Sequence, residues 1–194
     1  FVRHLGEIGA HAGMSDHFVS EAVYLSDPDG LGIEVYADRP RSDWKTEDRQ
    51  LAMTTIPLDV QNLVAAGNDA PWTGMPAGTV LGHVHLYVRD LADAERFYHH
   101  AVGFDKIVWS YPGALFMSAG GYHHHVGTNT WAAGAPSSTD DDAQLLEWEI
   151  VVPTAHDVEA AAAAIASAGF ETRRDGTGVV VRDPWGTQLR LVAE

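Results

Sequence analysis

Two short stretches decide the fold: Asp27-Pro28-Asp29-Gly30 and Asp183-Pro184-Trp185-Gly186. Each has Asp at its first position, Pro at its second and Gly at its fourth, which is typical of a type I β-turn. Each turn precedes a run rich in apolar residues, Ile33-Glu34-Val35-Tyr36 in one case and Leu189-Arg190-Leu191-Val192 in the other. The same turn before the same kind of strand indicates that the chain is built from repeats.

A second pair of markers, Gly103-Phe104-Asp105 and Gly169-Phe170-Glu171, follows two predicted helices and supports the repetition. A complete unit is one strand, one helix and three strands, in about 50 residues. The first copy is predicted to have strands at 82–88, 107–109, 114–117 and 122–128 and a helix at 92–102; the second has strands at 146–152, 171–173, 179–182 and 189–192 and a helix at 158–168. The predicted fold class is α+β, made of repeated βαβββ modules.

The repeats also suggest how the chain is organised. Residues 1–40 are interpreted as the C-terminal part of a first domain, because the opening 36 residues look like the back half of a unit. Residues 41–79 are interpreted as a linker with one short helix at 60–66. Residues 80–194 are interpreted as a second domain of two modules, 80–132 and 144–194. Because the chain starts with Phe1 and its first residues have the pattern of a helix already under way, we expect it to be a fragment of a longer polypeptide.

The composition disfavours several classes of function. The 194 residues carry 12 Lys and Arg against 27 Asp and Glu, a net charge of −15, which disfavours binding to nucleic acids or to anionic membranes. The absence of cysteine removes disulfides, thiolate metal sites and a cysteine nucleophile. Since no run of about 20 apolar residues is present, a cytoplasmic protein is predicted.

Eleven histidines stand out against that background. His83 and His85 are two residues apart on a predicted strand, so both point to one face. His123, His124 and His125 lie in a predicted core strand, where His124 would face one side and its two neighbours the other, and buried imidazoles need partners. Five others are interpreted as surface residues: His4, His11, His99, His100 and His156.

Carboxylates inside predicted strands complete the set of candidate ligands. Glu34 lies between two apolar residues, and Glu147 and Glu149 alternate with apolar residues in a later strand. A half-solvated strand would explain any one of them. Two histidines and one carboxylate with open positions, however, make the facial triad of non-haem Fe(II) oxygenases, and repeated units could bring such residues together.

The stretch from Asp16 to Glu34 closely resembles the signature of type I extradiol ring-cleavage dioxygenases: a His, an apolar-Tyr pair, an acidic-Pro-x-Gly turn and a terminal Glu. Gly82-His83-Val84-His85, the run from Ser118 to His125, and Asn129-Thr130-Trp131 look like the catechol-2,3-dioxygenase branch of the same group. The chain thus resembles the vicinal-oxygen-chelate superfamily, which includes glyoxalase I and bleomycin-resistance proteins. This resemblance implies βαβββ modules that form cup-shaped half-barrels.

In the first domain, the resemblance implies that Glu34 is a metal ligand. His17 and Tyr24 would line the site as acid/base and substrate-contacting groups. The histidine partner of Glu34 would lie upstream of Phe1, and because a half-site would hold iron poorly, activity can be lost in this fragment.

In the second domain, His124 falls near the catalytic histidine position. The metal ligands there would be His83, a histidine of the triplet, taken as His125, and Glu147. Arg190 stands where the last-strand Glu of the pattern is expected, and a cation at that position would repel a metal ion.

The resemblance implies an oxidoreductase of aromatic catabolism, a metal-dependent extradiol dioxygenase that cleaves a catechol-like diol with O2. The expected cofactor is a divalent metal, Fe(II) first, with Mn(II) or Zn(II) as alternatives. Two other functions stay open on the same scaffold: a glyoxalase-type metal-dependent isomerase or lyase, and a metal-free protein that binds a small molecule such as an antibiotic. The expected partners are a small aromatic substrate, O2 and, by analogy, a second copy of the chain in a homodimer.

Overall fold

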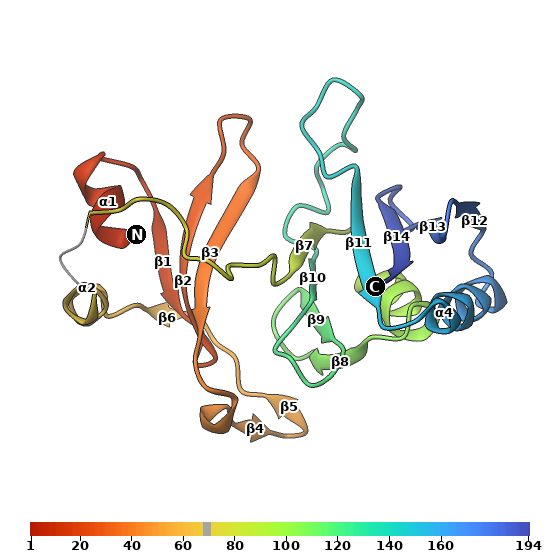
Figure 1. Ribbon diagram of the computed structural model, residues 1–194, viewed down its shortest axis with the longest axis horizontal. Helices are drawn as coiled ribbons and strands as arrows, with labels where there is room; N and C mark the ends of the chain where they lie inside the picture. The colour runs from red at the N-terminus through yellow and green to blue at the C-terminus, as the bar shows by residue number, and fades with distance from the viewer. Residues whose placement is uncertain (68–70) are drawn as a thin grey trace. The chain divides into compact units, whose positions relative to one another are not determined.

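The computed structural model describes residues 1–67 and 71–194, and the chain divides into two compact units, Phe1–Leu81 and Gly82–Glu194 (Figure 1). Both are α+β, and no sheet in the two described ranges closes into a barrel. The predicted fold class is confirmed. Residues 68–70 of the predicted linker lie outside the described residues. Within those ranges no helix is both long and apolar enough to cross a lipid bilayer.

The second unit contains two copies of one βαβββ module. The first consists of β7 (Val84–Tyr87), α3 (Leu91–Ala94) continued by the π-helix η2 (Glu95–Ala101), β8 (Asp105–Val108), β9 (Ala114–Ser118) and β10 (Val126–Asn129). The second consists of β11 (Glu147–Val152), α4 (Ala155–Ser167), β12 (Thr172–Asp175), β13 (Gly178–Arg182) and β14 (Gln188–Ala193). The sheet orders are β7-β10-β9-β8 and β11-β14-β13-β12, so in both modules the first strand pairs in parallel with the last.

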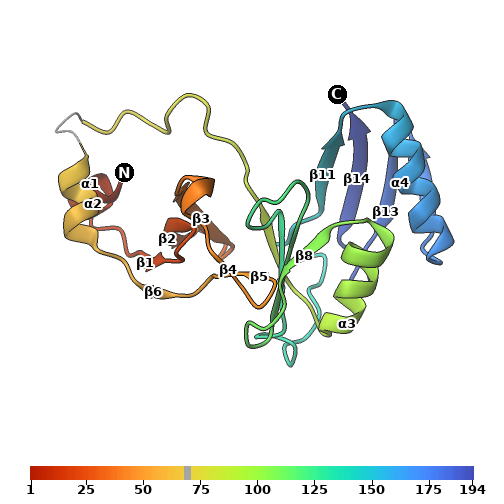
Figure 2. The ribbon, with the colours of Figure 1, turned by 90° about the horizontal axis from the view of Figure 1, so that it is seen from below.

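The helices of both modules begin at side-chain caps. Asp90 accepts a hydrogen bond from the backbone N–H of Asp93, and Thr154 forms a reciprocal capping box with Asp157. Such caps satisfy backbone donors that have no partner inside the helix. Figure 2 shows α4 alongside β13 and β14, and α4 also packs against η2. The two modules therefore share one apolar core, in which Phe97, Tyr98 and Ile165 are fully buried.

The first unit repeats only part of this pattern. Its elements are α1 (Val2–Glu7), β1 (Gly13–Asp16), β2 (Ser20–Ser26), β3 (Gly32–Asp38), the 3-10 helix η1 (Arg41–Asp43), β4 (Thr46–Glu47), β5 (Gln50–Leu51), β6 (Ile56–Pro57) and α2 (Val60–Ala66). The order β3-β2-β1-β6 is antiparallel throughout. The predicted helix at 60–66 is confirmed. Strand β1 was not predicted, because Gly13-Met14-Ser15-Asp16 has no apolar alternation and is held by its pairing with β2.

The histidine triplet corrects one prediction. We expected it inside the last strand of the first module, but β10 begins at Val126, after the triplet. Gly120 and Gly121 both have positive φ, +64° and +67°, which turns the chain before the strand begins. The triplet is therefore not part of a strand, and its side chains do not alternate between two faces of the sheet. The side chains of His123 and His124 lie together, with their Nδ1 atoms 2.8 Å apart.

Candidate active site

Three residues predicted from the sequence lie in one hydrogen-bonded chain in the first unit. The Tyr24 hydroxyl lies 2.6 Å from Nε2 of His17 and 3.0 Å from Oε1 of Glu34. Strand register explains the second contact, because Tyr24 of β2 is paired directly with Glu34 of β3. The cluster is open to solvent, since Tyr24 is 37% exposed. A small molecule can therefore reach the phenol and the carboxylate together.

The position of the His17 ring is fixed from its other side. Its Nδ1 lies 2.6 Å from the backbone carbonyl oxygen of Thr54. A carbonyl oxygen only accepts, so Nδ1 carries a proton and donates it to Thr54. Nε2 is then the ring nitrogen that faces the hydroxyl of Tyr24, which donates its own hydrogen bond to Glu34.

A strained turn places His17. It joins β1 to β2 and contains Phe18, a non-glycine residue with φ +68°, which is unfavourable for L-residues. The carboxylate of Asp16 accepts the backbone N–H of Phe18 at 2.8 Å and is held by both terminal nitrogens of Arg39 at 2.6 Å. Arg39 also binds Glu21. The hydrogen bond that Arg39 donates to Asp16 lowers the pKa of Asp16. This ionic cluster supports the turn that presents His17.

The second unit brings together some of its predicted residues and not others. The ring centroids of His83 and His124 are 4.1 Å apart, and both His123 and His124 are buried. His125 accepts the backbone N–H of Ala119 through Nδ1 at 3.2 Å. The ring of His83, which lies directly before β7, thus lies beside the rings of His123 and His124 at one end of the first module.

Glu147 has different neighbours. Its carboxylate accepts hydrogen bonds from the side chains of Gln188 and Arg190, and these interactions lower its pKa, the bond from Gln188 most. Arg190 also pairs with Asp175 and lies 3.5 Å from Glu149. The described contacts of Glu147 are therefore those of an ion-pair network, which competes with a cation for the carboxylate.

One strand position carries a different residue in the hairpin of the first unit and in each of the two modules of the second unit. Glu34 on β3 pairs with Tyr24, and Arg190 on β14 pairs with Val180 in the same register, seven residues after the first Asp of the respective turn. Arg190 pairs on its other side with Glu149, which lies five residues before the helix cap Thr154.

The corresponding residue of the first module is Gly127. It pairs with His85, which lies five residues before the cap Asp90. A Cβ on Gly127 would lie 2.8 Å from Nδ1 of His85, so glycine is needed there to let that ring cross the strand. The side-chain Nδ2 of Asn129 lies 2.8 Å from Nε2 of His85 and holds the ring in place. The position is thus Glu34 in the first unit, Gly127 in the first module and Arg190 in the second module. Of these three residues, only Glu34 has a side chain that can bind a metal.

The profile of the Glyoxalase/Bleomycin resistance protein/Dioxygenase superfamily matches residues 80–191 of the chain. The chain belongs to this superfamily. The resemblance inferred from the sequence is thereby confirmed, and the two modules of the second unit are the part that matches.

A relative in Bacillus subtilis (strain 168) is named catechol-2,3-dioxygenase. It is 43% identical to this chain over 182 residues, which cover 92% of the chain and 64% of the relative. The chain therefore spans less than two thirds of the length of that relative.

Solved structures of other members are more distant. A lactoylglutathione lyase from Agrobacterium tumefaciens is 14% identical, with 61% of this chain and 96% of that one covered and a TM-score of 0.45. A mutant of the fosfomycin resistance protein FosX from Listeria monocytogenes, complexed with Mn(II), is 15% identical, with coverages of 61% and 90% and a TM-score of 0.45.

The donor chemistry at the first site fits a divalent metal in part. A carboxylate oxygen such as that of Glu34 suits Fe(II), Mn(II) and Zn(II) alike. In residues 1–67 and 71–194, however, Glu34 belongs to no group of three His or acidic side chains whose ligand atoms lie within 4.8 Å of one another. Glu34 is therefore a candidate for a single ligand of such a metal, with Tyr24 and His17 beside it.

Proposed function

We propose that the protein is an extradiol ring-cleavage dioxygenase, in which Glu34 binds the metal and Tyr24 and His17 handle protons of a catechol-like diol. The observation that carries this proposal is the hydrogen-bonded chain from His17 through Tyr24 to Glu34. The name of the relative from Bacillus subtilis supports the same reaction class. The metal proposed is Fe(II), with Mn(II) or Zn(II) as the alternatives.

The divalent metal, when bound, supplies Lewis acidity that lowers the pKa of a chelated diol and holds it beside its co-substrate. Glu34 contributes a negative ligand for it. Tyr24 lies next to that ligand, so its hydroxyl is placed to donate a hydrogen bond to a diol oxygen or to pass a proton onward.

His17 is the general base of this proposal. Because Nδ1 donates its hydrogen bond to the carbonyl of Thr54, the ring presents Nε2 toward Tyr24. A proton that leaves the diol can move through the hydroxyl of Tyr24 to Nε2, and the imidazolium that forms keeps its bond to Thr54. The order of groups is base, relay and metal ligand, which is what deprotonation of a chelated diol requires.

The second unit supports a different role. Gly127 and Arg190 occupy the positions that correspond to Glu34, and Arg190 is bound by acidic side chains. We infer that this unit binds a small molecule without a metal at that position. His83 and His125, predicted from the resemblance as metal ligands, and His124, predicted as a catalytic residue, would in that case line the site of the small molecule.

The proposed reaction is tested by incubating the Fe(II)-loaded protein with catechol and a panel of substituted diols. Ring cleavage gives a yellow product and consumes one O2 per diol. Tyr24→Phe should slow turnover by about 100-fold or more, because it removes the proton relay. Turnover without O2 consumption would indicate an isomerase, and metal-loaded protein that turns over no diol would overturn the proposal.

A further inference from the structure

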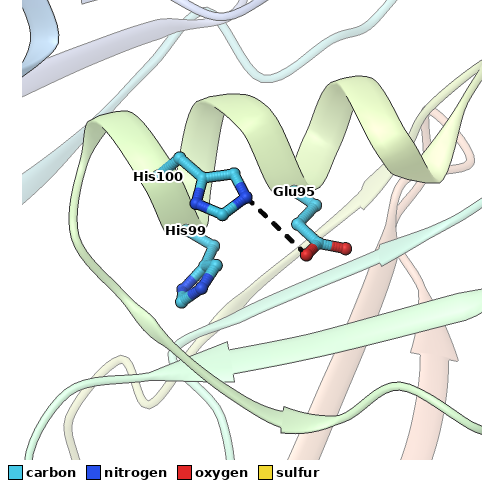
Figure 3. A group of neighbouring side chains, drawn as sticks. All are labelled: Glu95, His99 and His100. Atoms are coloured by element: carbon cyan, nitrogen blue, oxygen red, sulfur yellow. Dashed lines mark ion pairs between the residues drawn. The ribbon is translucent and has the colours of Figure 1, made fainter. Parts of the chain in front are cut away.

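A group of side chains that could hold a metal ion lies on the helix of the first module, at Glu95, His99 and His100 (Figure 3). Each residue offers one ligand atom, and the three atoms lie within 4.8 Å of one another. From the sequence alone, both histidines were predicted to lie on the surface. His100 is exposed, but His99 is half-buried and hydrogen-bonded. This group therefore differs from scattered surface histidines.

The π-helix η2 explains how the three residues meet. In an α-helix each residue turns by about 100°, so residues 95 and 100 would point in clearly different directions. A π-helix is wider and bonds each residue to the fifth one along, and such turns are frequent at functional sites. The backbone N–H of Val102 donates to the carbonyl of Phe97 at 2.9 Å, which is a bond of this kind. Residues 99 and 100 can thereby both approach residue 95.

The ring of His99 is held as a metal-binding histidine usually is. Its Nδ1 lies 2.6 Å from the backbone carbonyl oxygen of Phe104, so Nδ1 donates and Nε2 keeps its lone pair. Metal-bound histidines commonly donate their other N–H to such a carbonyl, which fixes the ring. The ring of His100 lies beside it, with centroids 4.6 Å apart, and its Nε2 is 3.8 Å from Oε1 of Glu95.

Glu95 supplies the charge. Its Oε1 lies 2.6 Å from Nζ of Lys106, and this hydrogen bond lowers the pKa of Glu95, so the carboxylate is ionised at neutral pH. Nζ of Lys106 also lies 5.6 Å from the ring centroid of Trp109, within range of a cation–π interaction. Lys106 therefore has a second partner if a metal ion takes Glu95.

We propose that Glu95, His99 and His100 bind a Zn²⁺ ion, at a site separate from Glu34 and independent of the ring-cleavage reaction. Two imidazoles and one carboxylate are a ligand set that zinc accepts, with a water molecule at the fourth position. The exposure of His100 makes the site accessible to metal from solution. Lys106 competes with the ion for Glu95, so it weakens binding.

Zinc titration by calorimetry tests the site, with Co²⁺ as a probe whose visible absorption reports tetrahedral ligands. Both measurements use the full chain in the Glu34→Gln background, which removes the proposed ligand at the other site. His100→Ala should weaken Zn²⁺ binding by about 10-fold or more and reduce the Co²⁺ band. Lys106→Gln should strengthen Zn²⁺ binding, because it removes the competing cation.

His156→Ala is the matched control, since His156 is an exposed histidine at the start of α4, the corresponding helix of the second module. The affinity of the His156→Ala protein for Zn²⁺ should stay within about twofold of that of the parent, as expected for a residue outside the ligand set. His99→Ala would also remove the hydrogen bond to the carbonyl of Phe104 and could disturb the fold, so the substitution of the exposed His100 is the better test. Equal affinities and equal Co²⁺ spectra for His100→Ala and His156→Ala would overturn the proposal.

Discussion

The hairpins β2–β3 and β13–β14 are the same structure with different chemistry. Both turns close by the same backbone bonds, Asp27 N–H to the carbonyl of Leu31 and Asp183 N–H to that of Thr187. Both use a glycine with positive φ at the fourth position, +91° at Gly30 and +98° at Gly186. The backbone of this hairpin is thus specified by its turn, whatever side chains follow.

The side chains that follow set the function. The cross-strand pair is Tyr24 and Glu34 in the first hairpin, and Val180 and Arg190 in the second. The first pair is joined by His17, whereas Arg190 is bound by Glu147 and Asp175. One scaffold therefore carries a candidate metal ligand in one place and a charge network in the other, as expected when function resides in sites rather than in folds.

Substitutions at the paired position of each hairpin should separate the two hairpins most clearly. Glu34→Gln should reduce ring cleavage by more than about 100-fold, because it removes a metal ligand and the partner of Tyr24. Arg190→Gln is the matched change in the second hairpin and should leave turnover within about twofold of the parent. Steady-state rates with catechol decide it, and equal losses in the two variants would contradict the assignment.

The two turn aspartates should differ in their effect on stability. Asp183 is 6% exposed and accepts bonds from the hydroxyl of buried Tyr98 and from two backbone N–H groups, whereas half-buried Asp27 accepts two backbone bonds. Asp183→Ala leaves buried donors unsatisfied and should lower the free energy of unfolding by about 3 to 5 kcal/mol. Asp27→Ala should cost about 1 kcal/mol, because water replaces its bonds. Urea denaturation measures both, and equal costs would show that the contact with Tyr98 adds nothing.

The pair of Tyr98 and Asp183 also predicts a pH dependence. Burial raises the pKa of the Tyr98 phenol well above its ordinary value, and the charge and hydrogen bond of Asp183 add to this. In the unfolded chain that pKa is about 10. The stability that the phenol contributes is therefore complete below pH 10 and lost above it, by about 1.4 kcal/mol per pH unit.

Tyr98→Phe removes this titration. Its deficit in unfolding free energy relative to the parent should shrink as pH rises from about 10 to 11. Urea denaturation of both proteins at several pH values checks it. A deficit that stays constant across this range would contradict the raised pKa.

The smallest expected effect concerns the strained turn. The β12–β13 turn has Gly176 at φ +61°, whereas the β1–β2 turn has Phe18 at +68°. Phe18→Gly should stabilise the first unit by about 0.5 to 1 kcal/mol, because it relieves an unfavourable φ and Phe18 is half exposed. Thermal unfolding measures it, and a destabilised variant would mean that contacts of the Phe18 ring outweigh the strain.

The repeated modules could be predicted from the sequence because turn residues and helix ends have local signals. The turn motif, the glycines after the helices and the apolar runs predicted the eight described strands of the second unit without reference to distant residues, although β10 begins later than expected, at Val126. Strand β1 lacks such a pattern and exists through pairing with β2. The π-helix at Glu95–Ala101 has no recognised local signal either, and the cluster of Glu95, His99 and His100 was missed with it.

The candidate site was predictable where residues belong to one hairpin. Tyr24 and Glu34 are ten residues apart, and a turn between them sets their register, so a sequence motif can capture both. The hydrogen bond from His17 to the carbonyl of Thr54 joins residues that are 37 positions apart, and no sequence pattern indicates it. The partners of Glu147 depend likewise on the pairing of β11 with β14, which only the folded sheet defines.

The location of iron tests the account most directly. Crystals of the Fe(II)-loaded protein, measured at the iron absorption edge, should give an anomalous peak about 2.0 to 2.2 Å from the carboxylate of Glu34, with Tyr24 beside it and no peak at Arg190. Iron bound elsewhere in the chain, with none at Glu34, would contradict the assignment of this hairpin as the metal-binding one.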